Sequence, residues 1–306
     1  MNILFAGSPN SSAKVLDSLS NETGLRVKAV ITQPDKRGKR GNKIIESHVA
    51  EKAKLLNIPV FKPTDLNDKH FKAELSSLDI EFLIVVAYGK LIPDWLIELP
   101  KITSINVHFS ILPKYRGASP IQSALLNADA ESGITIIKIN DELDSGDVYS
   151  SFIQIVDKDD DKISLENKLT ELCNANLFNV LKKINSNKLE ALPQDHSNAT
   201  YCNKVLKQDS EITFYDSSAN IINKFKAYIE WPGISFKHKE EVIKIHKIEK
   251  TDIDSSGNPG TFHKIDKTGL YVNTMDKLVV ITYLQFQSKN IISSNDLYNS
   301  HKDFFK

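Results

Sequence analysis

An amide and an imidazole stand two residues apart at the end of an apolar run, as Asn106 and His108 in the stretch SINVHFSILPKYRGASP. Residues two apart on a β-strand point to the same face, so the two side chains would be presented together. A carboxamide can donate a hydrogen bond to a developing oxyanion, and an imidazole can carry a proton. Together they meet two requirements of acyl transfer. From spacing alone, a purely structural role for His108 stays open.

A carboxylate that orients or charges the imidazole would complete such a site. The best candidate is Asp144, in the polar loop NDELDSGD that follows an apolar run at 134–139. If that run is a strand parallel to 105–108, both loops open at the same edge of the sheet. Pro113 and Gly117 are expected to bend the chain that walls the site, with Arg116 facing outward or bound to an acid.

Five short, β-branched apolar runs predict strands that are buried on both faces. They are Ile3–Ala6, Val27–Thr32, Ile58–Phe61, Phe82–Ala87 and Ile105–His108, and helical patterns containing Val15, Ile44, Val49, Phe71 and Leu75 lie between them. This alternation predicts an α/β fold with a doubly wound, Rossmann-like, mostly parallel sheet. Ligands bind such sheets at the carboxyl ends of the strands, which is where Asn106 and His108 fall.

The remainder of the chain predicts two further strands, at 134–139 and 148–155, and helices at 120–127 and 163–184. Residues 190–205 lose periodicity and are expected to form a linker. Beyond it, one helix is followed by short alternating segments, which is typical of a small OB-like β-barrel. We therefore expect a catalytic domain at 1–189 and a second domain at 206–306.

Composition excludes several function classes. The 306 residues have a formal net charge of zero and are 41% hydrophobic, as expected of a soluble globular protein. The two cysteines, Cys173 and Cys202, match no metal or redox spacing, so a cytoplasmic location is expected. No apolar stretch approaches the roughly 20 residues of a membrane span, so no membrane partner is expected. FAGSPNSS lacks the dinucleotide fingerprint. The acidic run at 157–161 fails as a calcium loop, because Lys162 and Lys168 stand where Gly and Glu are needed. No metal or nucleotide cofactor is therefore predicted.

Several motifs in order carry a resemblance to a known family. They are Asn106-Val107-His108, Ser110-Ile111-Leu112-Pro113, Arg116-Gly117 and Leu143-Asp144-Ser145-Gly146-Asp147. The set is similar to the N-x-H, S-L-L-P-x-x-x-G and L-D-x-G-D signature of the 10-formyltetrahydrofolate-dependent formyltransferases, with Ile111 in place of the usual Leu. The resemblance implies the fold, 10-formyltetrahydrofolate as formyl donor, and Asn106, His108 and Asp144 as catalytic residues. It also implies folate contacts along two segments, at Tyr88, Gly89, Leu91 and Ile92 and at Ser110, Ile111, Leu112 and Pro113.

Other stretches resemble the methionyl-tRNA formyltransferases within that family. They are TQPDKRGKRGNK, VVAYGKLIP, ATYCNKV and WPGISF. This likeness implies initiator methionyl-tRNA as partner. The chain is expected to be a monomer, although the sequence alone leaves its oligomeric state open. Basic residues that could contact the phosphates are Lys36, Arg37, Lys39, Arg40 and Lys43, in a loop after the second strand, and Lys204 and Lys207 near the linker.

Two alternatives stay open. A nucleotide-sugar N-formyltransferase would keep the three catalytic residues and the donor, but would accept an amino-sugar. A noncatalytic RNA-binding protein would keep the basic loop and the barrel, and would ignore folate. The intact amide, imidazole and carboxylate argue against the second alternative.

Overall fold

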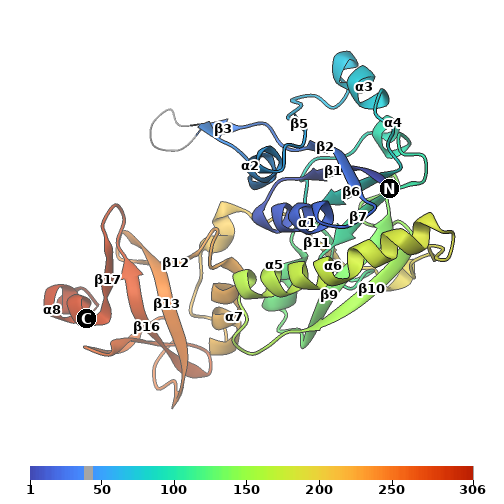
Figure 1. Ribbon diagram of the computed structural model, residues 1–306. Helices are drawn as coiled ribbons and strands as arrows, with labels where there is room; N and C mark the ends of the chain where they lie inside the picture. Colours follow the sequence, from blue (N-terminus) through green and yellow to red (C-terminus); the bar gives the residue numbers. More distant parts are fainter. Residues whose placement is uncertain (38–43, 306) are drawn as a thin grey trace. The chain divides into compact units, whose positions relative to one another are not determined.

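The computed structural model describes residues 1–37 and 44–305, and the chain divides into two compact units (Figure 1). The first unit comprises residues 1–120, 131–156 and 166–203, and the second comprises 121–130, 157–165 and 204–306. The predicted domain limits of 1–189 and 206–306 stay a prediction, because each unit gathers separate stretches of the chain. Within the described residues, no helix combines the length and apolar character that a membrane span requires.

A seven-stranded sheet forms the centre of the first unit. Its strands are β1 (Asn2–Gly7), β2 (Arg26–Ile31), β5 (Val60–Phe61), β6 (Phe82–Val86), β7 (Thr103–His108), β9 (Glu131–Lys138) and β10 (Val148–Ile155), in the order β10-β9-β7-β6-β1-β2-β5. The five strands from β7 to β5 are parallel. The predicted α/β class and mostly parallel sheet are confirmed.

One strand direction differs from expectation. Strand β9 runs antiparallel to β7, with His108 opposite Thr135 and Ile105 opposite Lys138. Strand β10 returns antiparallel beside β9, so the two form a hairpin at the edge of the sheet. The parallel arrangement considered for 134–139 was therefore wrong, and the route by which Asp144 reaches β7 is different.

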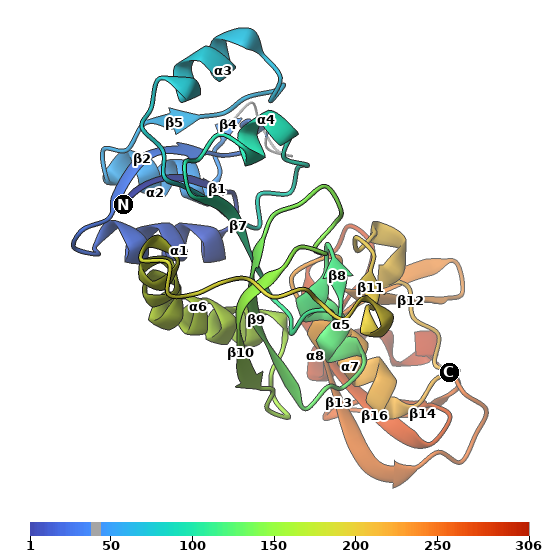
Figure 2. The same ribbon diagram turned by 90° about the vertical axis from the view of Figure 1, so that its right-hand side faces the viewer.

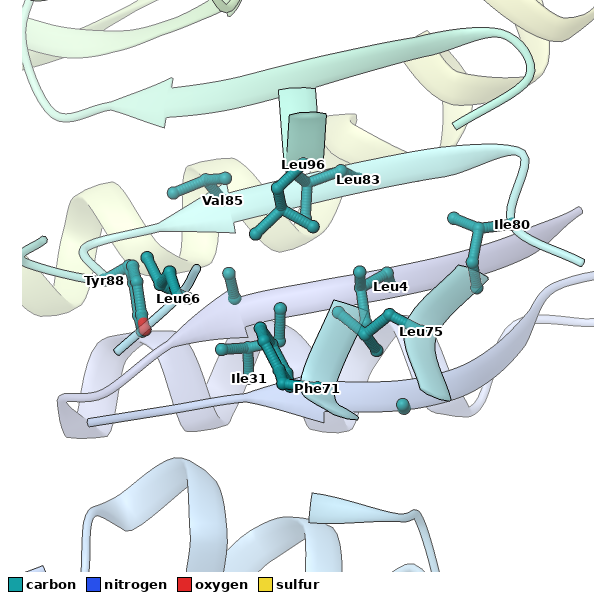
Figure 3. Packing of buried hydrophobic residues seen from close by; sticks show 12 residues of the cluster. Leu4, Ile31, Leu66, Phe71, Leu75, Ile80, Leu83, Val85, Tyr88 and Leu96 are labelled. Carbon is teal, nitrogen blue, oxygen red and sulfur yellow. The ribbon is translucent and has the colours of Figure 1, made fainter. Parts of the chain in front are cut away.

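Helices cover both faces of this sheet. Those of the first unit are α1 (Asn10–Ser20), α2 (His48–Leu55), α3 (Lys69–Ser76), α4 (Asp94–Ile97) and most of α6 (Lys162–Asn185), whereas α5 (Pro120–Leu126) falls almost entirely in the second unit. Figure 2 shows α3 on one side of the sheet and α1 on the other. Alternation along the strands explains the two layers, because successive side chains point to opposite faces. Leu4 and Leu83 point to the face where Phe71 and Leu75 of α3 complete a buried core (Figure 3).

An antiparallel sheet forms most of the second unit. Its strands are β12 (Ile234–His238), β13 (Glu241–Asp254), β14 (Phe262–Asp266), β15 (Gly269–Asn273), β16 (Lys277–Gln285) and β17 (Ile291–Ser293), and its helices include α7 (Ser218–Tyr228) and α8 (Ser294–His301). The strand order is β12-β13-β16-β15-β14, with β17 paired to β16. The separate, antiparallel β-domain expected after the α/β domain is confirmed.

Aromatic side chains bring the two end strands of this sheet together. His238 of β12 lies edge-on to Phe262 of β14, with ring centroids 4.7 Å apart. Phe305, in the short helix η3 (Lys302–Phe305), contacts both rings and is 3% exposed. The sheet thus closes on itself through side chains at this point, as a small barrel requires.

Candidate active site

Asn106 and His108 lie on the same face at the carboxyl end of β7. The strand forms there because TSINVH is β-branched and apolar at alternate positions, and both neighbouring strands bury it. His108 is buried, with a relative exposure of 5%, whereas Asn106 is half-buried. The sequence predicted this pairing, and the structure places the two side chains together around a third group.

The His108 ring is held at its Nε2 atom. Nε2 lies 2.8 Å from the carbonyl oxygen of Tyr115. A carbonyl only accepts hydrogen bonds, so Nε2 carries a hydrogen and donates it. Tyr115 itself is fixed in a left-handed conformation with φ of 60°, and its amide donates to Thr200 Oγ1 at 2.8 Å. The ring nitrogen left to gain or lose a proton is therefore Nδ1.

Asp144 faces that second ring nitrogen. Its Oδ2 lies 3.5 Å from His108 Nδ1 and accepts a hydrogen bond from the amide of Gly117 at 2.8 Å. Its Oδ1 accepts from Asn106 Nδ2 at 3.1 Å. The amide, imidazole and carboxylate thus form one cluster, although Asp144 is 38 residues from Asn106 in the chain.

Asp144 reaches this cluster through the loop of the β9–β10 hairpin, not through a parallel strand. The loop turns sharply at Asp144, where φ is 50°, a left-handed conformation that aspartate tolerates better than most residues. At Gly146 a Cβ atom would lie 1.8 Å from the carbonyl oxygen of Lys138, so only glycine fits. These two features explain the D-x-G spacing in local steric terms.

The arrangement suits acyl transfer. The Asn106 amide has two N–H groups and uses one of them on Asp144, so the other can donate to an oxyanion. Nδ1 of His108 can hold a proton beside the Asp144 carboxylate, which would stabilise the imidazolium. Among the described residues, no group of three or more His, Cys, Asp and Glu side chains could hold a metal ion.

Arg116 lies inside the protein, which corrects the expectation that it faces outward or binds an acid. Its relative exposure is 2%, and its Nε and Nη2 atoms donate to Gln194 Oε1 at 3.1 and 2.7 Å. The remaining contacts of its guanidinium are with His196 Nδ1 and Tyr201 Oη. The contacts reach Arg116 from the segment expected to be a linker.

That segment supplies site residues that sequence reasoning missed. Strand β11 (Tyr201–Cys202) pairs in parallel with β8 (Arg116–Gly117), and the Arg116 amide donates to the Thr200 carbonyl at 2.8 Å. A Cβ at Gly117 would lie 2.1 Å from the carbonyl oxygen of Cys202. Tyr115, Gln194 and Thr200 therefore shape the surroundings of the cluster. Most of these contacts use backbone atoms, which leave no signal in the sequence.

The first segment predicted to contact folate lies after β6. Tyr88 is 1% exposed and belongs to the hydrophobic core, where Figure 3 shows it beside Leu66. Burial raises the pKa of its hydroxyl to about 12. Its carbonyl accepts from Gln33 Nε2 at 2.9 Å. Leu91 is 87% exposed, Ile92 packs against the core, and Gly89 has φ of 78°.

The second predicted folate segment lies directly after β7. Ser110 is buried and its hydroxyl donates to the Lys114 carbonyl at 2.6 Å. The amide of Leu112 donates to Thr135 Oγ1 at 3.0 Å, and Ile111 is half-buried beside Gly133. Pro113 is half-buried, and its carbonyl accepts from the Thr200 amide. The role of both segments in folate binding stays a prediction.

The basic loop begins and ends in a short hairpin. Its strands are β3 (Lys36–Arg37) and β4 (Ile44–Ile45), and both basic residues of β3 are exposed. Lys39, Arg40 and Lys43 lie outside the described residues. Lys204 and Lys207 are exposed in the second unit.

One lysine ties both ends of this hairpin to the sheet. Lys62 Nζ lies 2.6 Å from Asp35, just before β3, and 2.8 Å from Glu46, just after β4. Hydrogen bonds from Lys54 and Lys62 lower the pKa of Glu46 to about 2. Burial disfavours the charge of Lys62, but its bonds with Asp35 and Glu46 outweigh that effect and raise its pKa. Both shifts favour the charged forms of Glu46 and Lys62 at neutral pH.

Two family models match most of the chain. The model of the "Formyl transferase" family matches residues 1–181, and that of the "Formyl transferase, C-terminal domain" family matches residues 204–302. The chain is 38% identical over 304 residues to the methionyl-tRNA formyltransferase of Sulfurihydrogenibium sp. (strain YO3AOP1), covering 99% of this chain and 97% of the relative.

Two solved structures share the fold. HypX from Aquifex aeolicus in complex with tetrahydrofolic acid has a TM-score of 0.64 at 16% identity, covering 100% of this chain and 47% of that one. An N-formyltransferase from Helicobacter canadensis, in complex with folinic acid and dTDP-3-aminofucose, has a TM-score of 0.67 at 20% identity. The match covers 91% of this chain and 98% of that one. At these identities the likeness concerns the fold alone.

Proposed function

This chain belongs to the methionyl-tRNA formyltransferase family, and from that premise we propose that it transfers a formyl group from 10-formyltetrahydrofolate to the α-amine of methionine on initiator methionyl-tRNA. The observation that carries the proposal is the convergence of Asn106 and His108 on Asp144, the first at hydrogen-bond distance and the second at ion-pair distance. Two of them come from β7 and the third from a distant hairpin.

In the proposed reaction, the methionine amine attacks the formyl carbon, so that a new C–N bond forms and the carbonyl oxygen becomes an oxyanion. Asn106 donates its second N–H to that oxygen, together with His108 carrying a proton on Nδ1. Asp144 stabilises the imidazolium. The C–N bond to the folate nitrogen then breaks, and a proton passes from the amine to that nitrogen. The donor is already activated, so the step needs neither a metal nor a nucleotide.

The donor site in this proposal lies beside the catalytic cluster. The two segments assigned to folate are Tyr88, Gly89, Leu91 and Ile92 after β6, and Ser110, Ile111, Leu112 and Pro113 after β7. Strands β6 and β7 are parallel neighbours, so both segments leave the sheet at the same edge. The folates named for the two structural neighbours support a folate as the ligand in this proposal.

The basic loop is proposed to contact tRNA phosphates. Arg37→Gln together with Arg40→Gln should flatten the dependence of tRNA binding on salt, by about one unit of log–log slope for each phosphate that the variant no longer neutralises. Titrating tRNA binding from low to high salt measures the slope. The pair Lys183→Gln and Lys188→Gln, exposed at the end of α6 and just beyond it, provides the matched control. An unaltered slope in the arginine variant would remove the loop from the tRNA site.

Lys62 should act on tRNA through the same loop. Lys62→Met removes the ion pairs to Asp35 and Glu46, so the KM for methionyl-tRNA should rise about threefold to tenfold, with the KM for the folate donor unchanged. Initial rates at a fixed donor concentration measure this effect. Lys101→Met is the control, because its ion pair with Asp79 is also on the surface of the first unit. A rise of the same size in both variants would contradict a specific role for Lys62.

The decisive assay is incubation with labelled 10-formyltetrahydrofolate and methionyl initiator tRNA, alongside uncharged tRNA and amino-sugar acceptors. Transfer only to the charged tRNA is expected. Transfer to an amino-sugar would favour a nucleotide-sugar N-formyltransferase, and no transfer with intact RNA binding would favour a noncatalytic RNA-binding protein. The 38% identity to a methionyl-tRNA formyltransferase, over 99% of this chain and 97% of that relative, supports the tRNA acceptor.

The proposal also covers organisation and location. It comprises a catalytic domain at 1–189, a linker at 190–205, and an OB-like domain at 206–306 that contacts tRNA through Lys204 and Lys207. The protein is further proposed to be a monomer in the cytoplasm.

A further inference from the structure

The Gln194 side chain joins the two loops that meet at the catalytic cluster. Its Oε1 accepts from Arg116 Nε and Nη2 at 3.1 and 2.7 Å. Its Nε2 donates to the carbonyl oxygens of Asp144 and Gly146 at 2.9 and 2.7 Å. A carboxamide has two lone pairs and two hydrogens for such bonds, so this one is fully used.

The orientation of this carboxamide is dictated by its partners. Arginine can only donate, and backbone carbonyls can only accept, so the amide oxygen must face Arg116 and the amide nitrogen must face the hairpin loop. Gln194 is 7% exposed. Because these groups are buried, any one left without its partner would cost free energy.

The position of these bonds matters for Asp144. Gln194 binds the carbonyl of Asp144 itself, at a residue whose φ of 50° lies outside the ordinary regions of conformation. On the other loop it binds Arg116, the neighbour of Gly117, whose amide donates to the Asp144 carboxylate. The carboxylate is thus fixed relative to His108 from both sides.

We propose that Gln194 is a positioning residue that holds the Asp144 carboxylate against His108 during formyl transfer. This role rests on the proposed function and assigns a catalytic consequence to the segment expected to be a linker. Gln194 touches neither the substrates nor the reacting atoms in this assignment, and acts through the Asp144 loop.

Gln194→Glu is the sharpest test. The side chain keeps its size and can still accept from Arg116, but its second oxygen would face two carbonyl oxygens at about the present distances. Repulsion should displace the Asp144 loop, and a displacement of about 1 Å can cost about 10²-fold in rate. We expect kcat to fall by about that factor, while both KM values stay within about twofold.

Asn273→Asp is the matched control. Asn273 is also a buried carboxamide with four hydrogen bonds, to Ser256, Gly257 and twice to Thr261, but it lies in the second unit. It undergoes the same chemical change away from Asp144, so any general loss of stability should appear in both variants. Only Gln194→Glu should lose kcat at a temperature where both are folded.

A double-mutant cycle separates positioning from a merely structural role. In an Asp144→Asn background, Gln194→Glu should reduce kcat by less than about threefold further, because the group that it positions is already impaired. If Gln194→Glu does not fold, the shorter, neutral Gln194→Asn replaces it in the same cycle. The positioning role would be overturned if the losses of kcat from the Asp144 and Gln194 substitutions multiplied fully in the double variant. It would also be overturned if the single Gln194 variant had normal kcat. An inactive wild-type chain would instead reject the proposed function.

Discussion

Replacing Asp144 with asparagine should lower kcat for formyl transfer by about 10³- to 10⁴-fold, as removal of the carboxylate does where it orients a catalytic histidine. Asp144 Oδ1 accepts a hydrogen bond from the Asn106 side chain, and its Oδ2 accepts one from the Gly117 amide. Asparagine offers a single acceptor oxygen, so its NH₂ would face one of these two donors. The variant also loses the charge beside His108 Nδ1. Single-turnover rates with labelled donor and charged tRNA would measure the effect.

Asp141→Asn is the control for this experiment. Asp141 lies in the same hairpin loop and is exposed, so the identical chemical change there should leave kcat within about twofold of wild type. Circular dichroism and thermal melting should show both variants folded. If Asp144→Asn retained wild-type turnover, Asp144 would have no catalytic role and the proposed mechanism would fail.

Replacing His108 with glutamine should lower kcat by about 10²- to 10⁴-fold, the usual contribution of a positioned acid–base group. Glutamine has an NH₂ that can donate to the Tyr115 carbonyl in place of His108 Nε2, which keeps the loop anchored. It cannot carry a proton at the place of Nδ1. The expected result is a loss of kcat with little change in the KM for tRNA.

His70→Gln provides the comparison for His108→Gln. His70 is exposed on α3, so its replacement should leave both kinetic constants unchanged. The thermal midpoint of each variant, measured with that of wild type, separates chemistry from folding. A His108→Gln protein with normal kcat and a lowered midpoint would assign this histidine the structural role that its spacing alone left open.

Much of the α/β fold could be predicted because its strands are short, apolar and separated by helical patterns. Strand β10, at Val148–Ile155, has the predicted bounds, and α6 differs from 163–184 by one residue at each end. The position of Asn106 and His108 at the end of β7 follows from the same alternation. The direction of a strand does not follow from the sequence pattern, because an apolar run has the same periodicity in either direction. A parallel arrangement was considered for the run at 134–139, whereas β9 is antiparallel to β7.

The surroundings of the cluster could not be predicted for a different reason. Tyr115 acts through its carbonyl, and Thr200 through both its carbonyl and its hydroxyl. The segment around Gln194 has no periodicity, since it consists of a single bridge from Leu192 to Val148, the short helix η1 (His196–Asn198) and a two-residue pairing with β8. Tertiary contacts of this kind depend on the folded backbone and not on local residue patterns.

The ring contacts between β12 and β14 have a consequence for aggregation. Strand β14 is an edge strand of the sheet. The unpaired backbone groups of an edge strand can form hydrogen bonds with a strand of another copy of the protein. Phe262 projects from this strand into the cluster completed by His238 and Phe305. We expect these aromatic contacts beside β14 to hinder its pairing with another copy of the protein.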